Sequence, residues 1–475
     1  MLRVDLAHEI TIQDSEQPIE RRNSVTERTS IHGTWTSKLG FVLATTGAAV
    51  GLGNIWMFPY MAGENGGGAF VIIFLICVAL IGIPALLAEM VIGRRGKCNP
   101  ADSMQHVAIE SGHSGNWKWA GWFAMLALVL VLSFYSVVSG WSLAYLMRAI
   151  GGVFNHASPA TIQSVWTHFQ ADPWEMLLWH TVFMVLTMWI IARGVQAGIE
   201  KASVIMMPLL FVILLLLVAY GFSTSGFDAA VSFLFHPDFS KVTAMTVIAA
   251  LGQALFSMAV GAGCMLIYGA YVGKKTKLAN AIWIISLLNV LVAILAGLAI
   301  FPIVFTHHLQ AASGPALMYM TLPIAFSHMV GGQLFEILFF VLLFFAALTS
   351  SVSQAEPLVA LLMEKLKIKR NGAAFMVGFV AWVIGIGSLL SFNSWQHVKL
   401  FGHWTIFDLS TNIPIKIILP IGALSFVIFA GWVMKRTVIR DEASLTEGWV
   451  FNVWRFLIRY TVPIAIVVIM IASVI

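Results

Sequence analysis

Two apolar stretches of the chain carry nearly the same glycine-interrupted sequence, AVGLG at residues 49–53 and AVGAG at residues 259–263. Each lies within a hydrophobic segment of membrane length, where glycine costs roughly 1 kcal/mol of helix propensity relative to alanine. The bilayer core offers no water to backbone N–H and C=O groups that leave the helical pattern, so such groups occur there only inside protein or along a cavity. The two breaks therefore predict a binding site where two unwound helices meet.

Close helix packing is the alternative explanation for these glycines, because glycine is common in membrane helices. Matched interruptions in the two halves of a chain are, however, typical of secondary transporters built from inverted repeats. Polar side chains also gather around both breaks, and close packing does not require them. The pair of breaks therefore favours a transport site.

The composition indicates the elements that must hold these breaks. Hydrophobic residues make up 59% of the chain and charged residues only 10%, with a mean hydropathy of +0.88. No water-soluble core could hide so much apolar surface, so the chain is a polytopic membrane protein with the lipid bilayer as its surroundings. Eleven spans of roughly 20 residues or more are expected, near residues 37–60, 69–93, 119–147, 173–193, 202–222, 244–270, 279–306, 332–364, 372–391, 408–434 and 453–474.

The breaks fall in the first and sixth spans, which divides the chain into two sets of five helices and one additional helix. We expect an all-α 5+5 inverted-repeat transporter fold with broken helices 1 and 6. The repeats would cover residues 37–222 and 244–434, and an eleventh helix residues 453–475. Residues 1–36 are polar and lack the apolar stretch of a signal peptide, which predicts a cytoplasmic tail.

Basic residues set the expected orientation. They follow spans two, four, six, eight and ten, whereas the loops at residues 148–172, 223–243 and 307–331 hold almost none. The positive-inside rule then places the N-terminus in the cytoplasm and, after an odd number of spans, the C-terminus outside an inner cell membrane. The net charge of +5 is thus a topology signal, and no nucleic-acid partner is expected.

Signatures of enzymes and metal sites are missing from the sequence. It contains no HExxH, GxSxG or phosphate-loop motif, and ENGGG at residues 64–68 resembles a loop between spans. Cys77, Cys98 and Cys264 have no ligand-type spacing, so neither a disulfide framework nor a metal site is predicted. We therefore expect a protein that is not an enzyme.

The residues around the first break carry a specific resemblance. They read WTSKLGF at residues 35–41, GAAVGLGNIW at 47–56, FPY at 58–60 and ENGGGAF at 64–70. With GQ at 252–253 and FAALTSS at 345–351, the chain from about residue 32 to 434 resembles the neurotransmitter:sodium symporter family, and most closely its bacterial eleven-helix amino-acid transporters. The resemblance implies sodium-coupled import of an α-amino acid by alternating access. The leucine-transporting member of this family is itself the usual example of broken helices in a transporter.

The resemblance implies two sodium sites made of hard oxygen ligands. The second site would use backbone carbonyls and hydroxyls of Gly47, Val50, Ala346, Thr349 and Ser350. The first site would use Ala49, Asn54, Ser257 and Asn289, together with the substrate carboxylate. Sharing that carboxylate couples ion binding to solute binding. The hydroxyls of Thr349 and Ser350 could instead bond to carbonyls one turn earlier in their own helix.

Charge balance at the first sodium site departs from the family. Chloride-independent relatives place an acid where Asn289 or Ala293 stands, and the chloride-binding tyrosine of other members aligns with Phe74. Chloride is therefore not expected, and either one or two sodium ions are consistent with the sequence. A further intramembrane acid, Glu89, is expected to brace the broken helices.

The resemblance also outlines a pocket for the substrate. Backbone amides near Leu52 and Gly53, at the positive end of a half-helix, would receive a carboxylate with the Tyr135 hydroxyl. Gly51 stands where monoamine carriers have Asp, which favours an amino acid. The rest of the pocket would be formed by Ala49, Val131, Phe256, Ser257, Ala259, Ala262, Ser350 and Gln354.

Two of these residues bear on specificity. Relatives have a bulky residue where Ala262 stands and an aliphatic one where Gln354 stands, which favours a large or polar substrate side chain. Gln354 could alternatively form a hydrogen bond between helices.

The gates of the family are altered in this chain. The outer Arg–Asp pair aligns with Met57 and Thr411, while Lys416, about one turn deeper, either replaces the cation or extends to water. The inner arginine aligns with His32, which would face Glu364 beside Trp35. The altered gates keep one alternative open, a membrane sensor or scaffold of the same fold that binds amino acid without moving it. A membrane enzyme is a more distant alternative.

Overall fold

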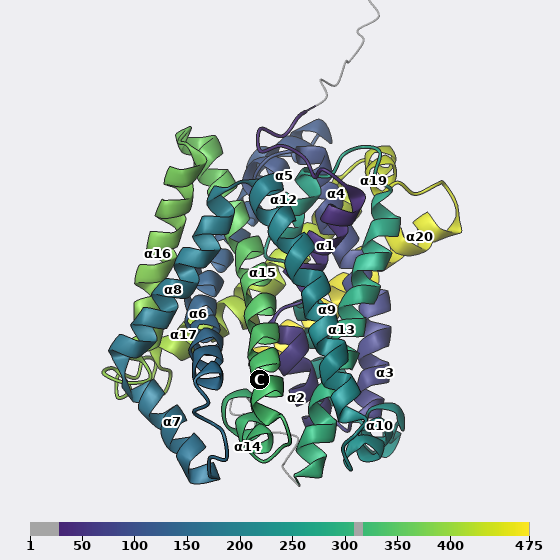
Figure 1. Ribbon diagram of the computed structural model, residues 1–475. Coiled ribbons are helices and arrows are strands. Elements are labelled where there is room, and N and C mark those ends of the chain that lie inside the picture. The colour runs from purple at the N-terminus through teal and green to yellow at the C-terminus, as the bar shows by residue number, and fades with distance from the viewer. Residues whose placement is uncertain (1–27, 308–316, 475) are drawn as a thin grey trace, which may run out of the picture.

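The computed structural model describes residues 28–307 and 317–474, so most of the predicted N-terminal tail lies outside the described residues. Helices form nearly all of the ordered structure, and no strand longer than an isolated bridge occurs in the described ranges (Figure 1). In these ranges nine helices are long and apolar enough to cross a membrane, and a tenth span consists of two helices joined at a bend.

The long spans agree with the expected ones to within a few residues. The nine spans without a sharp bend are Gly68–Gly96 (α3, η2 and α4), Gly115–Ile150 (η3 and α6), Pro173–Ala192 (α8), Val195–Gly221 (η4 and α9), Leu278–Thr306 (α13), Gly332–Leu366 (α15), Arg370–Leu390 (α16), Ile406–Val433 (α17, η7, α18 and η8) and Trp449–Ser473 (α20, η9 and α21) in the described part of the chain. Shorter helices join them: α5 (Pro100–Glu110), α7 (Pro159–Ala171), α10 (Phe227–Phe235), η5 (Phe239–Lys241), η6 (Leu317–Thr321), α14 (Leu322–Ser327) and α19 (Arg436–Ala443).

The first span is broken at the predicted glycines. Helix α1 (Lys38–Ala49) starts at the N-cap Ser37, and Val50 then adopts an extended conformation with φ −76° and ψ 98°. The chain resumes as η1 (Gly53–Met57) and α2 (Phe58–Glu64) at an angle of 57° to α1. The break packs closely against α15, because a Cβ atom on Gly51 would lie 2.6 Å from Ser350 Oγ.

The sixth expected span is interrupted over a longer stretch. Helix α11 (Ala244–Ser257) ends six residues before α12 (Cys264–Ala270) begins. Ala259, Gly261 and Gly263 have φ values of +52°, +93° and +82°, a conformation that favours glycine. A Cβ atom on Gly261 would lie 2.4 Å from the Leu419 carbonyl oxygen, so the unwound chain also needs the missing side chain for close packing.

Glu89 on α4 satisfies the backbone donors that this interruption exposes. Its carboxylate accepts from Gly261 N at 2.8 Å, Gly263 N at 3.0 Å and Leu266 N at 3.2 Å, and the side chain is fully buried. Unpaired buried N–H groups would be costly, so Glu89 stabilises the unwound form of the sixth span.

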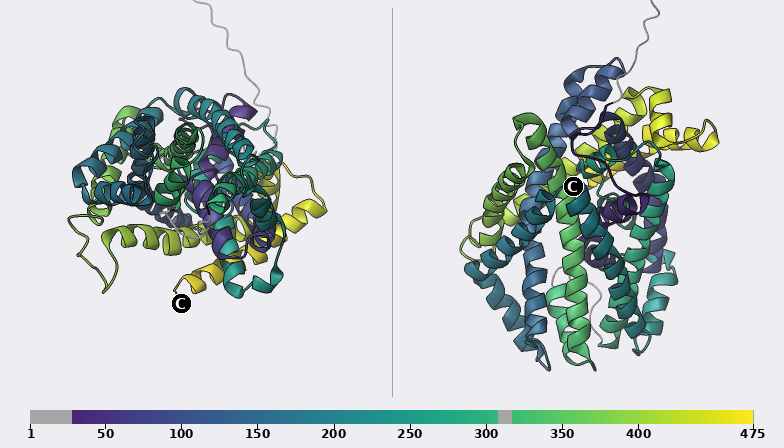
Figure 2. Two further views of the ribbon diagram at one scale, coloured as in Figure 1. Left: turned by 60° about the horizontal axis from the view of Figure 1, so that its bottom comes forward. Right: turned by 45° about the horizontal axis from the view of Figure 1, so that its top comes forward.

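The broken helices lie inside a shell of long helices. Helix α1 packs against α9, α13 and α15, while α15 packs along α6 and α12 along α4. The C-terminal helix α21 packs against α18 at the edge of the bundle (Figure 2). The two breaks are therefore held between helices that are themselves continuous.

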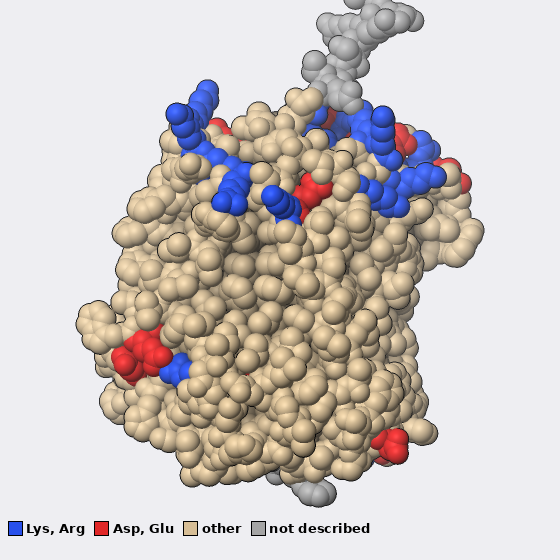
Figure 3. All heavy atoms as spheres, viewed as in Figure 1, with Lys and Arg blue, Asp and Glu red and all other residues tan. Residues whose placement is uncertain are grey.

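Charged side chains gather at the ends of the bundle. In Figure 3 most Lys and Arg side chains lie at the end where α5 and α19 are found, and a broad band almost free of charge covers the side of the molecule. Such an uncharged band is what a bilayer requires of the surface it covers.

Candidate functional site

The five groups predicted for the second sodium site lie together between α1 and α15. Ser350 Oγ is 3.4 Å from the Val50 carbonyl oxygen, and Thr349 Oγ1 is 3.1 Å from that of Ala346. A Cβ atom on Gly47 would lie only 3.1 Å from Thr349 Cβ, which places the glycine backbone directly against α15. All five residues are buried. The assembly offers a cation oxygen atoms from two helices.

The sequence left open whether the hydroxyls of Thr349 and Ser350 bond to carbonyls of their own helix. The Thr349 hydroxyl does so, and the Ser350 hydroxyl does not. Thr349 Oγ1 donates to carbonyls three and four residues earlier, those of Ala346 and Phe345. Ser350 Oγ instead reaches across to Val50 on α1. At least one of the two hydroxyls thus faces the break itself.

The residues predicted for the first sodium site form a connected polar group. Asn54 Nδ2 donates to Asn289 Oδ1 at 2.9 Å, and Asn289 Nδ2 lies 3.5 Å from Ser257 Oγ. Both asparagines are 0% exposed, yet Asn54 Oδ1 has no hydrogen-bond partner among the described residues. Ala49 is buried at the end of α1. A fully buried acceptor without a donor fits a ligand for a cation.

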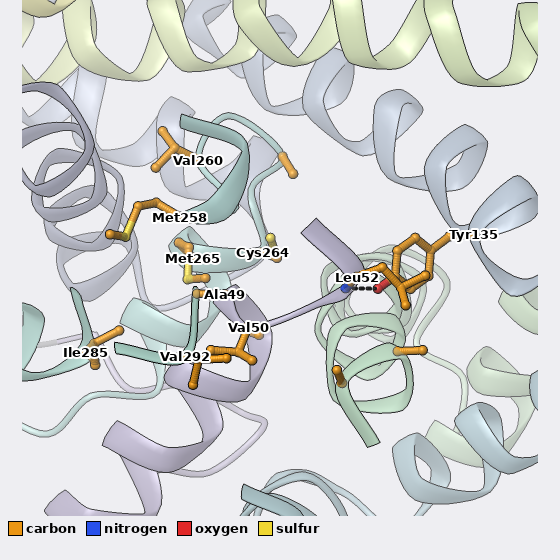
Figure 4. Close-up of a cluster of buried hydrophobic side chains, with 14 of the residues drawn as sticks. Ala49, Val50, Leu52, Tyr135, Met258, Val260, Cys264, Met265, Ile285 and Val292 are labelled. Carbon is orange, nitrogen blue, oxygen red and sulfur yellow. Dashed lines mark hydrogen bonds between the residues drawn. The ribbon is translucent and has the colours of Figure 1, made fainter. Parts of the chain in front are cut away.

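The predicted carboxylate site surrounds the start of η1. The Leu52 amide donates to the Tyr135 hydroxyl at 3.3 Å (Figure 4). A Cβ atom on Gly53 would lie 2.7 Å from the Phe256 ring, so α11 and the first break are in close contact. Figure 4 also shows that Ala49, Val50 and residues of the second break, such as Val260 and Cys264, belong to one buried cluster.

The residues predicted to surround the substrate side chain differ in their environments. Ala262 is buried, whereas Val131 and Ala259 are half-buried. Gln354 is half-buried too, and its Oε1 is enclosed without a hydrogen-bond partner in the described part of the chain. No helix–helix bond uses this oxygen, which favours a role toward a bound solute over the alternative.

Two of the three residues predicted for the inner gate, His32 and Glu364, are in contact, and Trp35 lies nearby in sequence. His32 Nε2 lies 2.7 Å from Glu364 Oε1, and Trp35 Nε1 donates to the Tyr268 carbonyl at 3.1 Å. Asn99, which the sequence analysis did not single out, adds its backbone amide to Glu364 at 3.0 Å. These contacts join the segment before α1 to α15 and to the residues that precede α5.

The outer gate lacks an ion pair at the positions that align with the family's pair. Met57 and Thr411 are half-buried, and Thr411 Oγ1 donates to the Phe407 carbonyl within its own helix at 2.9 Å. Lys416 is exposed on the surface, which favours extension toward water over replacement of the missing cation.

Two further residues at the site were missed by sequence reasoning. Gln253 Nε2 donates to the Gly53 carbonyl at 2.8 Å and so joins α11 to the first break. Glu200 accepts from Thr36 N at 2.8 Å and from Ser37 N at 3.2 Å, next to the start of α1. The GQ motif at residues 252–253 was the only sequence signal for the first, and nothing beyond an acid beside an apolar span marked the second.

Comparisons with known proteins show the family to which the chain belongs. The model of the sodium:neurotransmitter symporter family matches residues 32–158 and 154–475. The chain is 38% identical over 438 residues to the uncharacterized sodium-dependent transporter YhdH of Bacillus subtilis, covering 92% of this chain and 96% of that protein. It is 34% identical over 447 residues to an uncharacterized sodium-dependent transporter of Haemophilus influenzae, covering 93% and 98%.

A solved structure extends the likeness to three dimensions. The crystal structure of MhsT in complex with L-phenylalanine superimposes with a TM-score of 0.85 at 39% sequence identity, covering 93% of this chain and 99% of that one. The predicted fold class and the predicted absence of an enzyme activity are thereby confirmed. With its broken helices, its sodium-type ligand groups and these relatives, the chain belongs to the sodium:neurotransmitter symporter family of sodium-coupled membrane transporters.

Proposed function

We propose that the protein imports an α-amino acid together with sodium by alternating access. The observation that carries the proposal is the start of η1, where the Leu52 amide points at the Tyr135 hydroxyl beside the first break. A substrate carboxylate at this point would replace a weak 3.3 Å contact by charge-assisted hydrogen bonds. It would also lie close to Asn54, whose free oxygen is available to a sodium ion.

The same location argues against a monoamine. A carrier of an amine without a carboxylate needs an acid near the ion, and Gly51 has no room for one, since even a Cβ atom would lie 2.6 Å from Ser350 Oγ. The structural relative was crystallised with L-phenylalanine, which is itself an α-amino acid. An amino acid supplies its own carboxylate and is therefore the better fit.

Counterflow of a labelled amino-acid panel in proteoliposomes tests the proposal, with sodium or potassium on both sides. We expect exchange of at least one amino acid that requires sodium. Sodium-dependent binding without exchange would favour the non-transporting sensor. One observation favours the sensor: Met57 and Thr411 stand at the aligned positions of the outer gate, which therefore lacks its ion pair.

We expect large or polar amino acids to be preferred. Ala262 is smaller than the residue that relatives carry at this position, and we expect a larger substrate side chain to occupy the difference in volume, because an empty apolar cavity is costly. Gln354 presents an unpaired oxygen that a polar substrate group would satisfy.

Gln354→Leu is expected to shift the preference toward leucine or methionine by about 1–3 kcal/mol, the usual scale for an unpaired buried polar group. Competition between labelled and unlabelled amino acids measures this shift. Gln333→Leu is the matched control, because Gln333 lies on the same helix and bonds to the Ala149 carbonyl outside the pocket. An unchanged ranking of competitors in Gln354→Leu would assign Gln354 to packing.

Chloride should not be required. Phe74 has no hydroxyl to offer an anion and packs against Phe58 at 5.0 Å between ring centroids, in a fully buried aromatic contact. Replacing chloride by gluconate is therefore expected to leave the initial rate of sodium-driven uptake unchanged. A steep dependence of this rate on chloride concentration would contradict our interpretation of the first site.

The protein would couple transport to one or two sodium ions. At the second site Ser350 lies near the Val50 carbonyl and Thr349 near that of Ala346, whereas the first site has neutral side chains only and would rely on the substrate carboxylate for charge. The proposed membrane is the inner cell membrane, with the N-terminus in the cytoplasm and the C-terminus outside, in keeping with the basic end of the bundle.

A further inference from the structure

Two arginines stand near the start of the last span. Arg455 belongs to α20 (Trp449–Phe456), and Arg459 follows one turn later in η9 (Leu457–Thr461). Figure 1 shows α20 at the edge of the bundle, and Figure 3 shows most Lys and Arg side chains at the same end. Both arginines are half-buried in a span that is apolar enough to cross a membrane. Cations in such a position need a partner, which this part of the structure identifies by its chemistry.

Arg459 is held in place by η8 (Phe429–Val433). Its Nε donates to the Gly431 carbonyl at 2.7 Å, and its guanidinium lies 4.8 Å from the centre of the Trp432 ring. Trp432 Nε1 in turn lies 3.4 Å from the Arg459 carbonyl oxygen. A side chain that merely extends toward water is not fixed in this way. These contacts leave the two Nη groups of Arg459 without a hydrogen-bond partner among the described residues.

Arg455 has no acid of its own in the described part of the chain. It forms no hydrogen bond or ion pair there, and the charged groups within electrostatic range are Arg459, Arg436 and Glu447. Glu447 already accepts hydrogen bonds from Arg436 and, at 2.9 Å, from Arg440. Two guanidinium groups of like charge therefore stand one helical turn apart, where an anion between them would relieve their repulsion.

The surface beside the two arginines is aromatic and outward-facing. Trp432, Phe456 and Tyr460 are all exposed. The ring centroids of Trp432 and Tyr460 are 5.7 Å apart, and those of Tyr460 and Phe456 5.3 Å, so the three rings form a row. Tryptophan and tyrosine are enriched at the level of lipid headgroups. The row therefore places the arginines at the depth of a headgroup, with apolar surface next to them for acyl chains.

The chemistry of the donors indicates the kind of headgroup. The planar guanidinium of arginine presents parallel N–H groups that match two oxygen atoms of a phosphate. Basic pockets between membrane helices also bind anionic headgroups of lipids. A phosphate that is joined to acyl chains uses both the free Nη groups of Arg459 and the exposed aromatic row, whereas a free phosphate ion uses the arginines alone.

We propose that Arg455 and Arg459 form a binding site for the headgroup of an anionic phospholipid. Arg459 donates to the phosphate oxygens through its Nη groups, and Arg455 supplies the second positive charge. The acyl chains lie along Trp432, Tyr460 and Phe456. The site is separate from the sodium sites and from the substrate pocket, and it does not depend on which solute is carried.

Native mass spectrometry of the purified full chain in detergent measures this binding. Phosphatidylglycerol and phosphatidylcholine with identical acyl chains are titrated separately, in the absence of sodium and amino acid. Each basic residue near a membrane surface favours an anionic lipid by a factor of about five. We therefore expect the first phosphatidylglycerol to bind about 25-fold more tightly than the first phosphatidylcholine. Equal affinities for the two lipids would overturn the proposal.

A charge-matched pair of double variants tests the assignment to these residues. Arg455→Gln with Arg459→Gln should weaken phosphatidylglycerol binding about 25-fold and leave phosphatidylcholine binding unchanged. Arg193→Gln with Lys201→Gln removes two positive charges from the same end of the bundle, and Arg193 also lies over a tryptophan ring, that of Trp189, at 3.6 Å. This control should bind both lipids as the parent does. Parent-like affinity in the first variant, or an equal loss in the control, contradicts the proposed site.

Thermal unfolding of the purified variants shows whether they fold. Arg459 packs on η8, so the double variant is the one at risk, whereas Arg455→Gln alone breaks no hydrogen bond with the described residues. That single variant should weaken phosphatidylglycerol binding about fivefold, and an unchanged affinity would again refute the site.

Competition with inorganic phosphate separates a lipid site from a simple anion site. At the same molar concentration as the lipid, phosphate should displace no phosphatidylglycerol, and equal competition would overturn the assignment to a lipid. Because neither sodium nor amino acid is present, failure here leaves the proposed transport function untouched. Failure of the counterflow experiment likewise leaves the lipid result standing.

Discussion

Replacing Thr349 and Ser350 together by alanine is expected to abolish sodium-driven uptake in proteoliposomes. Their hydroxyls are the two side-chain ligands that we propose for the second sodium site, and the other proposed ligands are backbone carbonyls that no substitution removes. A hydrogen-bond-strength interaction with a charged group is worth about 1.5–3 kcal/mol, so losing two costs about 3–6 kcal/mol of ion binding, or a factor of about 100 or more.

The double variant should still fold. Alanine is a good helix former, Thr349 Oγ1 bonds only to its own helix, and the contact between Ser350 and Val50 is long at 3.4 Å. Ser351→Ala is the matched control, since Ser351 is adjacent on α15 and its buried hydroxyl has no partner in the described residues. Uptake at the parent rate in the double variant, or equal loss in the control, would remove the second sodium site from this interface.

The positions of the helices and of both breaks were predictable from sequence for a physical reason. Membrane spans are long apolar runs, which a sequence shows directly. A pair of glycines in the middle of such a run lowers the local helix propensity, and this too is visible in the sequence. The structure then breaks α1 after Ala49 and α11 after Ser257, next to those glycines. Local signals of this kind do not depend on how helices pack.

Contacts between distant helices were predictable only where the family resemblance supplied the register. The pairing of His32 with Glu364 came from that resemblance and is present at 2.7 Å. Gln253 to Gly53 and Glu200 to Thr36 join residues that are 200 and 164 positions apart, and no local pattern specifies which faces of two helices will meet.

The roles of these contacts also differ with the state of the transporter. A site that opens and closes needs contacts that are stronger in one conformation of the transporter than in the other. We expect the bond between His32 and Glu364 and the long contact between Leu52 and Tyr135 to be of this kind. The brace at Glu89 is different, because it fills backbone hydrogen-bond donors that the interruption of the sixth span leaves without helical partners.

Glu89→Gln is accordingly expected to lower the stability of the folded protein by about 3–6 kcal/mol and to abolish uptake. The glutamine amide keeps one acceptor oxygen but places an NH2 group where the second carboxylate oxygen was. This NH2 group is a donor and cannot accept a hydrogen bond from a backbone N–H group. At least one of the amides of Gly261, Gly263 and Leu266 then remains buried and unpaired, and the remaining bonds lose the strength that a charged acceptor gives them.

Glu336→Gln provides a matched control for this prediction, because it makes the same chemical change at a buried acid whose Oε1 has no partner. Thermal unfolding of both purified variants at one pH in the same detergent compares them directly. Because Glu336, on α15, forms no hydrogen bond through Oε1 with the described residues, the substitution removes no such bond, and that variant should remain within about 1 kcal/mol of the parent protein. Equal destabilisation of the two would mean that burial alone, rather than the hydrogen bonds to the unwound sixth span, determines the cost, and Glu89 would then not be the residue that holds the break in place.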